Sequence, residues 1–189
     1  MDLIKGILTR RSIGKVKSDP VPHELIEEVL HAGIHAPNHY RTEPWKFFVL
    51  EGDARKRLGL LFEKIEDEQI QEENLDVKSK KLERAKKNPL RAPVIIAVAV
   101  EPHSQRNVIS IEEYAAVHSA VQNMLLAAHY FGLGAIWRTG PLCYHPKVKD
   151  FFQLSQNGDL VAFIYLGYPD MNPPSVTKTS FESFTTWLN

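Results

Sequence analysis

An unbroken apolar run, Pro93–Val100, constrains the fold of this chain more than any other segment, because every residue after its proline is aliphatic. A run of this length without polar alternation is typical of a strand that is covered on both faces. It therefore predicts a central position in a sheet. Leu160–Tyr168 has the same character and predicts a second central strand, and Lys46–Leu50 predicts a shorter buried strand.

Helical patterns surround these strands. Small and apolar residues continue almost all the way round Glu112–Phe131, which predicts a long helix buried in the core or in an interface between subunits. Apolar residues on one face predict helices over Asp2–Thr9 and over a segment that ends before Pro37, and His145–Phe152 is expected to form a short helix. Strands and helices thus alternate at irregular spacing, which favours an α+β or α/β fold in a single domain, residues 1–189.

Two segments depart from this pattern. Residues 51–91 carry 21 of the 46 charged side chains, with the acidic residues concentrated before the basic ones. Neighbouring blocks of opposite charge satisfy each other, so we predict a solvated helical hairpin or excursion rather than a nucleic-acid patch. The tail, residues 169–189, contains Pro173-Pro174 followed by Phe181, Phe184 and Trp187, and it is expected to be extended and to dock on another surface, such as a partner subunit.

The overall charge and the cysteine content narrow the function classes. Lys plus Arg number 23 and Asp plus Glu number 23, so the chain offers no general attraction to nucleic acid or to acidic membranes. A single cysteine, Cys143, excludes a disulfide within the chain and fits the reducing cytoplasm. The first residues do not resemble a signal peptide, and no apolar run approaches the ~20 residues that span a bilayer.

Arg10-Arg11-Ser12, which directly follows a predicted short helix, is the first candidate for a binding site. Two guanidinium groups and a hydroxyl suit a phosphate, which arginine binds through two parallel hydrogen bonds. The alternative is a pair of solvated arginines at the C-terminal end of a helix, where the helix dipole favours cations.

His31, His35 and His39 are spaced by four residues, and imidazole is a common metal ligand. Pro37 interrupts the row, however. We therefore favour the interpretation that these histidines are exposed or contact a ligand over the interpretation that they form a metal site. The polar loop from Ala36 to Trp45 lies between a helix and a strand, where ligand-binding groups often lie, although an ordinary connector is the alternative.

The segment Gly132–Gly140 provides a fourth candidate, because glycines allow the backbone to approach a ligand closely. It is not a dinucleotide-binding fingerprint, and the chain has neither a Walker lysine motif nor a nucleophile elbow. Cys143 and His145 are two residues apart, but the apolar surroundings favour a buried, inert thiol over a nucleophile.

Taken together and in order, these segments and Gln122–Ala128 resemble the nitroreductase family of FMN-dependent oxidoreductases. The resemblance implies an α+β sandwich, with a central, mostly antiparallel sheet flanked by helices. It also implies an intertwined homodimer with two FMN molecules bound between the subunits. No catalytic side chain is implied, since the chemistry takes place on the flavin.

The resemblance further implies which residues contact the flavin. Arg10 and Ser12 match positions that hold FMN, with Arg11 between them, and Trp137-Arg138-Thr139 matches the segment whose backbone lies along the flavin ring near N5. His35 and His39 match positions that reach the flavin from the partner subunit. The remaining matches are Arg41, where many members have Asn, and Lys178, which aligns with a phosphate-binding residue in the tail of larger members.

Two departures from the family pattern bear on the redox properties of the flavin more than on its binding. Gly14 stands where many relatives have Arg or Lys near flavin N1 and O2, and Lys15 comes one residue later. Glu43 stands where Gln is usual, and we expect this carboxylate to turn away from the flavin or to pair with Arg41, since it would oppose an anionic reduced ring.

The resemblance implies an enzyme that passes hydride from NAD(P)H through flavin N5 to nitroaromatic, quinone or similar small-molecule acceptors by a ping-pong cycle. Three alternatives remain open from the sequence. They are a flavin-binding or storage protein with little turnover, a metalloprotein that uses the three histidines, and a structural dimerisation module.

Overall fold

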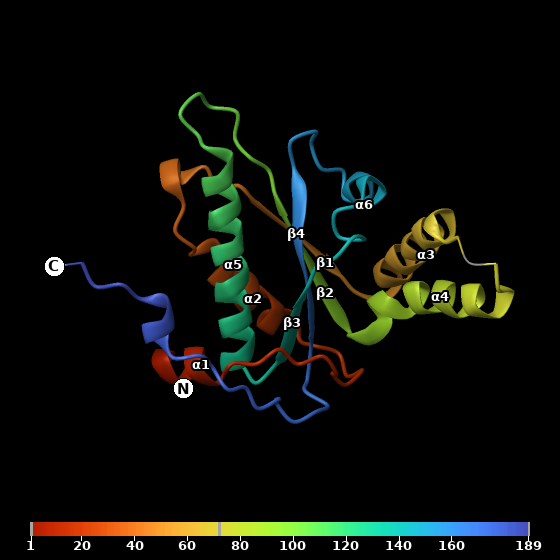
Figure 1. The fold of residues 1–189 in the computed structure, drawn as a ribbon, viewed down its shortest axis with the longest axis horizontal. Coiled ribbons are helices and arrows are strands. Elements are labelled where there is room, and N and C mark those ends of the chain that lie inside the picture. The colour runs from red at the N-terminus through yellow and green to blue at the C-terminus, as the bar shows by residue number, and fades with distance from the viewer. Residues whose placement is uncertain (1, 72, 189) are drawn as a thin grey trace.

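The computed structural model describes residues 2–71 and 73–188. One antiparallel sheet lies at its centre, with the strand order β1-β2-β4-β3 (Figure 1). Its strands are β1 (Trp45–Leu50), β2 (Val94–Val100), β3 (Gly134–Arg138) and β4 (Asp159–Gly167). β2 and β4 hold the two central positions that their apolar runs predict, and every residue of β2 is buried.

The prediction for β1 was wrong in one respect. Its segment forms a strand, but that strand lies at an edge of the sheet and pairs with β2 alone. Lys46 and Val49 on β1 are exposed, while Leu50 at its end is buried. A short apolar run does not distinguish an edge strand from a central one, because both need apolar residues on at least one face.

Helices cover both faces of the sheet (Figure 1). On one face lie α2 (His23–Ile34) and the long α5 (Ser110–Tyr130), and the core there includes Val29, Ile96 and Met124. On the other face lie α3 (Gly52–Gln69), α4 (Leu75–Lys87) and α6 (Pro146–Phe151), around a second cluster of buried apolar side chains. None of the helices in the described part of the chain is both long and apolar enough to cross a membrane.

The helix α5 is buried along much of its length, as its apolar sequence predicts. It ends at Tyr130, and Gly132 then adopts a φ of 75°, a left-handed conformation that glycine tolerates at a helix end. The chain can therefore turn back at once into β3. This turn places the end of α5 beside the start of the edge strand.

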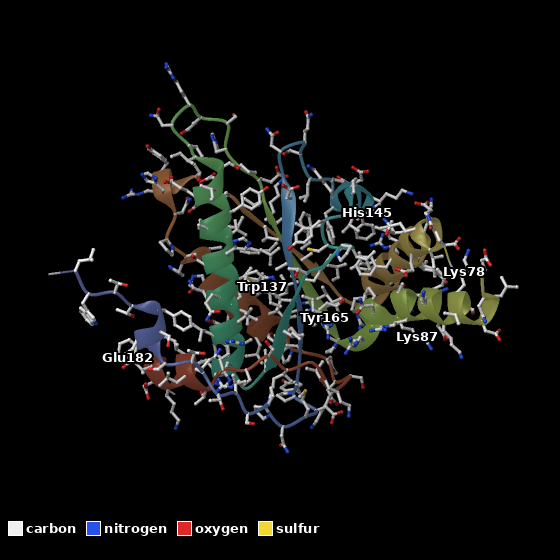
Figure 2. The ribbon with its side chains drawn as sticks, in the orientation of Figure 1. Lys78, Lys87, Trp137, His145, Tyr165 and Glu182 are labelled. Atoms are coloured by element: carbon white, nitrogen blue, oxygen red, sulfur yellow. The ribbon has the colours of Figure 1, made fainter. Side chains whose placement is uncertain are left out.

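The charged helices α3 and α4 pack against each other as a hairpin that projects away from the sheet (Figure 1). The helices approach so closely that a Cβ atom on Gly59 would lie 2.2 Å from the carbonyl oxygen of Lys86. Ion pairs join the two helices, with Lys78 Nζ 2.7 Å from Asp67 Oδ1 and Lys86 Nζ bound to Glu63. Figure 2 labels Lys78 and Lys87 on α4, and the short helix η2 (Asn88–Arg91) then leads to β2.

Both ends of the described chain expose apolar side chains. The helix α1 (Leu3–Thr9) lies beside the C-terminal end of α5, with Leu3, Ile4 and Leu8 exposed. From Pro169 the tail runs past α1 and ends away from the domain (Figure 1). The tail is extended except for the short helix η3 (Phe181–Phe184), and every described residue of it is exposed, including Trp187 at 80%.

Candidate functional site

The end of α1 forms one wall of a cavity of about 210 Å³ at the C-terminal end of α5. Arg10 and Arg11 both line it. The Arg11 side chain donates hydrogen bonds to the carbonyl oxygens of Leu8 and Arg10, each at 2.8 Å, which fixes its position against the backbone. Within the described part of the chain, neither guanidinium group forms an ion pair with a carboxylate. The cavity is therefore cationic. Ser12 is exposed and lies outside it.

His129, which the sequence analysis did not single out, also lines this cavity from the last turn of α5. Its Nε2 atom lies 3.0 Å from Thr9 Oγ1. Burial, together with the positive charges of Arg10 and Arg11, lowers the pKa of His129. A signal was present in the sequence, since His129 is a polar residue among small and apolar ones immediately before the glycine turn.

A second cavity, of about 340 Å³, is lined by all three residues of the Trp137-Arg138-Thr139 segment. Side chains alternate across the edge strand β3. Arg138 therefore turns toward α3 and lies over the ring of Tyr165, 5.2 Å from its centre, while Trp137 turns toward α5. Figure 2 labels Trp137 and Tyr165 on either side of this edge.

Arg138 lacks a hydrogen-bond partner for one of its buried nitrogen atoms in the described structure. Its Nε atom is buried and has no hydrogen-bond partner in the described structure, and no carboxylate pairs with the guanidinium group. Burial and the neighbouring Arg91 both lower the pKa of Arg138, although a guanidinium group stays charged near neutral pH. A buried polar group without a partner is costly, so this position favours an acceptor supplied by a ligand.

The two cavities lie along one edge of the sheet. β3 pairs only with β4, so its other side faces no strand within the described chain. The backbone N–H of Ile13 donates to the carbonyl of Ala135 at 3.0 Å, which brings the Arg10–Ser12 segment beside β3. The structure thus brings together two groups of predicted site residues that lie more than a hundred positions apart in the sequence.

A third group of predicted site residues lies on the loop around His39, and a buried carboxylate near the start of α5 holds this loop. Glu113 is only 1% exposed. It accepts hydrogen bonds from the Thr42 hydroxyl at 2.6 Å and from the backbone N–H of His103 at 3.2 Å. The side chain of Asn38 in turn accepts the backbone N–H of Glu43 at 2.7 Å. These bonds fix the loop that contains the short helix η1 (His39–Arg41).

This loop has an unusual backbone, because Tyr40, Arg41 and Glu43 all have φ between 50° and 60°. Such values are uncommon outside glycine and cost on the order of 1 kcal/mol or more for each residue. His39 and Arg41 are both exposed on the loop, and His39 Nδ1 lies 2.7 Å from Glu112 Oε2. Strain of this kind is often found where a loop presents side chains to a ligand.

The three histidines do not form a metal site in the described structure. His31 and His35 are neighbours on α2, with their Nε2 atoms 3.4 Å apart, whereas His39 stacks on Tyr40 and binds Glu112. No group of three or more His, Cys, Asp or Glu side chains among the described residues is arranged to hold a metal ion.

The predicted site residues therefore fall into two sets that one chain does not bring together. Arg10 and Arg11 lie beside His129, near the end of α5, whereas His39 contacts Glu112, near its start. At a rise of 1.5 Å per residue these contacts are about 25 Å apart along the helix. His35 lies at the end of α2 and is exposed there.

The two departures from the family pattern have clear structural outcomes. Lys15 forms an ion pair with Asp170 at 2.6 Å instead of pointing at either cavity. Glu43 is exposed and forms no ion pair with Arg41 in the described structure, so the expected pairing is not seen. Lys178 lies exposed on the tail. Burial raises the pKa of Cys143 to about 12, as expected of an inert thiol.

Comparison with known proteins assigns the family. The sequence model of the Nitroreductase family matches residues 7–168, which is most of the chain. The chain belongs to the nitroreductase family. The nitroreductase resemblance drawn from the ordered motifs is thereby confirmed, and so is the α+β fold with its antiparallel sheet flanked by helices.

Relatives of this nitroreductase-family chain match it along nearly its whole length. It is 33% identical over 171 residues to "Putative NAD(P)H nitroreductase YdjA" of Escherichia coli K12, with 90% of each chain covered. Its structure is similar to that of a nitroreductase-like family protein from Bacillus cereus, with a TM-score of 0.84, 25% identity, and coverage of 100% and 96%. A protein from Desulfovibrio desulfuricans, described as a "putative nitroreductase in complex with FMN", has the same fold, with a TM-score of 0.76, 24% identity, and coverage of 100% and 98%.

Proposed function

We propose that this protein is an FMN-dependent oxidoreductase that passes hydride from NAD(P)H to nitroaromatic, quinone or similar acceptors, and that it acts as a cytoplasmic homodimer. The observation that carries the proposal is the row of unpaired cations, Arg10, Arg11 and Arg138, along the β3 edge of a nitroreductase fold. The NAD(P)H in the name of the Escherichia coli relative and the FMN in the Desulfovibrio structure support it.

The residues present fit FMN. Arg10 and Arg11 provide two guanidinium groups in a small cavity, with no carboxylate partner in the described part of the chain, which suits a phosphate dianion. Arg138 has a buried Nε–H without an acceptor in the neighbouring cavity, beside Tyr165 and Asn88. A phosphate at one end and a planar ring with carbonyl oxygens at the other would satisfy both cavities.

When bound, FMN supplies a ring that accepts hydride from NAD(P)H and passes it on to the acceptor in a second half-reaction. The chain itself has three tasks. Arg10 and Arg11 would bind the phosphate, and the backbone of Trp137–Thr139 would hold the ring. Arg138 keeps a positive charge close to the site, which favours the more negative, reduced state of the ring. No side chain of the described site needs to exchange a proton with the acceptor in this scheme.

Two features of the single chain support the proposed homodimer. His39 contacts Glu112, about 25 Å along α5 from His129, which is too far to meet a mononucleotide held by Arg10. In this proposal His39, together with His35 and Arg41, reaches the flavin of the partner subunit instead. Apolar side chains also remain uncovered on α1 and along the tail, with Leu8, Phe184 and Trp187 between 66% and 80% exposed. An interface between two copies would cover them, as expected for exposed apolar patches of this kind.

An absorbance titration tests the proposal. The purified protein is scanned as isolated and after addition of FMN, and then under anaerobic conditions with NADPH or NADH. Bound-flavin peaks that bleach with either nucleotide and return with a nitroaromatic or quinone are the expected result. Flavin peaks that do not bleach would support a flavin-storage protein instead, and failure to bind FMN at all would refute the proposed function.

A further inference from the structure

The cavity at the end of α5 contains a group that the proposed function has not used. Arg10 and Arg11 enter from the end of α1, and His129 enters from α5. The other described residues that line it are Thr9, aliphatic residues, a glycine and two prolines of the tail, and none of these side chains is ionisable near neutral pH. The charged groups that act on the His129 ring are thus the two arginines, and both carry the same sign.

The hydrogen bonds around Thr9 favour one tautomer of this histidine. The Thr9 hydroxyl donates its hydrogen to the carbonyl oxygen of Lys5 at 2.7 Å, the usual bond for threonine within a helix. At 3.0 Å from His129 Nε2, the Thr9 oxygen then accepts a hydrogen bond from the ring. With the hydroxyl hydrogen donated to Lys5, the hydrogen of the neutral ring lies on Nε2, and Nδ1 carries a lone pair.

A neutral His129 is consequently unable to donate a second hydrogen bond. A lone pair on Nδ1 repels a phosphate oxygen, whereas protonation converts the same atom into a charged donor. In the protein without an anion, burial and the two arginines lower the pKa of His129 and oppose this protonation. A phosphate dianion in the cavity reverses the sign of the local field, which favours the protonated ring.

We propose that His129 is a third phosphate-binding residue of this site and that it binds the phosphate in its protonated form. The protein therefore takes up one proton, on His129, when FMN binds. The proposal rests on the proposed function, since FMN is the ligand that brings the phosphate. The phosphate affinity of the cavity then depends on pH, although the two arginines stay charged throughout.

The direction of this dependence follows from linkage. His129 has a higher pKa in the FMN complex than in the free protein. The gain in FMN affinity from protonated His129 is therefore complete when the pH is below the His129 pKa of the free protein. It disappears as the pH rises through the His129 pKa of the complex. Between these two values affinity falls about tenfold per pH unit, as for uptake of one proton. A phosphate monoester itself loses its second proton near pH ~6, so the measurement belongs above about pH 7.

The experiment compares FMN with riboflavin, which has the same ring but lacks the phosphate. Dissociation constants are measured by flavin fluorescence between about pH 7 and pH 9 for the wild-type protein, for His129→Gln and for His103→Gln. His103 is an exposed loop histidine outside both cavities, so its variant is the matched control. Glutamine retains a side-chain amide that can donate to Thr9 but does not titrate.

We expect the wild-type and His103→Gln proteins to lose FMN affinity as pH rises, by up to about tenfold per unit. His129→Gln should bind FMN more weakly near pH 7 and show a flat profile, and riboflavin binding should be flat in all three proteins. FMN profiles that coincide in His129→Gln and wild type would overturn the inference, and so would a riboflavin profile as steep as that of FMN.

A second measurement uses only the wild-type protein, in case the glutamine variant does not fold. Calorimetry in two buffers of different ionisation enthalpy should show proton uptake with FMN and none with riboflavin. Equal proton exchange for the two ligands would overturn the inference while leaving the proposed function intact. If the wild-type protein bound neither ligand, the proposed function itself would fail, and this inference with it.

Discussion

Glu113 provides the sharpest test of how the loop that carries His39 is held in place. Its buried carboxylate accepts hydrogen bonds from the Thr42 hydroxyl and from the backbone N–H of His103. In the variant Glu113→Gln one of the two oxygens becomes an NH2 group, which can donate but not accept. One charge-assisted hydrogen bond is lost and one donor is left unpaired, so we expect a loss of about 1.5–3 kcal/mol in the free energy of unfolding.

Chemical denaturation at a fixed protein concentration measures this loss, because association of subunits would contribute to the apparent stability. Glu27→Gln is the matched control, since Glu27 is exposed on α2 and its substitution should change the stability by less than about 0.5 kcal/mol. The same Glu113 variant should also bind FMN more weakly, because a looser loop presents His39 less well to the partner subunit. A Glu113→Gln protein as stable as the Glu27 control would refute the view that this carboxylate anchors the loop.

Four further predictions test other parts of the site. Arg10→Ala should weaken FMN binding by about 10- to 100-fold, the equivalent of one lost charge-assisted hydrogen bond, and an unchanged dissociation constant would count against Arg10 as a phosphate ligand. His39→Ala should change flavin binding or the rate of flavin reduction in stopped-flow experiments while sedimentation still shows a dimer, and wild-type kinetics would remove this residue from the site. The thiol of Cys143, with its pKa near about 12, should not react with a disulfide reagent near pH ~8 until the protein unfolds, so rapid labelling of the native protein would show that the thiol is accessible. Truncation after Pro173 removes the exposed aromatic residues of the tail and should shift the sedimentation profile toward monomer, whereas an unchanged profile would show that the dimer does not depend on the tail.

The sequence predicted the centre of the fold well because burial on all sides leaves a simple record. β2 and β4 are apolar without interruption, and α5 is apolar around almost its whole circumference, so few alternative placements exist. The expected burial of β1 was wrong, since the four-residue apolar run Phe47–Leu50 fits an edge strand as well as a central one. Sheet order depends on contacts between distant segments, and a local pattern does not encode those contacts.

The candidate site was predictable only in pieces. Arg10-Arg11-Ser12 and Trp137-Arg138-Thr139 were recognisable as separate motifs, but the bond between Ile13 and Ala135 that joins them is a contact between distant segments. His129 and Glu113 had a usable signal, since each is a polar residue on a mainly apolar helix. A polar residue on such a helix needs a partner inside the protein, and asking what that partner is would have pointed to both residues.

The pairing of cations with carboxylates differs between the α3–α4 hairpin and the β3 edge. This difference connects the fold to the proposed function. On the hairpin, cations such as Lys78 and Lys86 pair with carboxylates across the two helices. Along the β3 edge, Arg10, Arg11 and Arg138 have no such partners among the described residues, although the chain has as many acidic residues as basic ones. The weak negative field at the C-terminal end of α5 offsets only part of this cost, about 0.3–1 kcal/mol for each nearby cation. A fold selected for stability alone would place a carboxylate in these cavities, so their unpaired cations are best explained by an anionic ligand that completes the site.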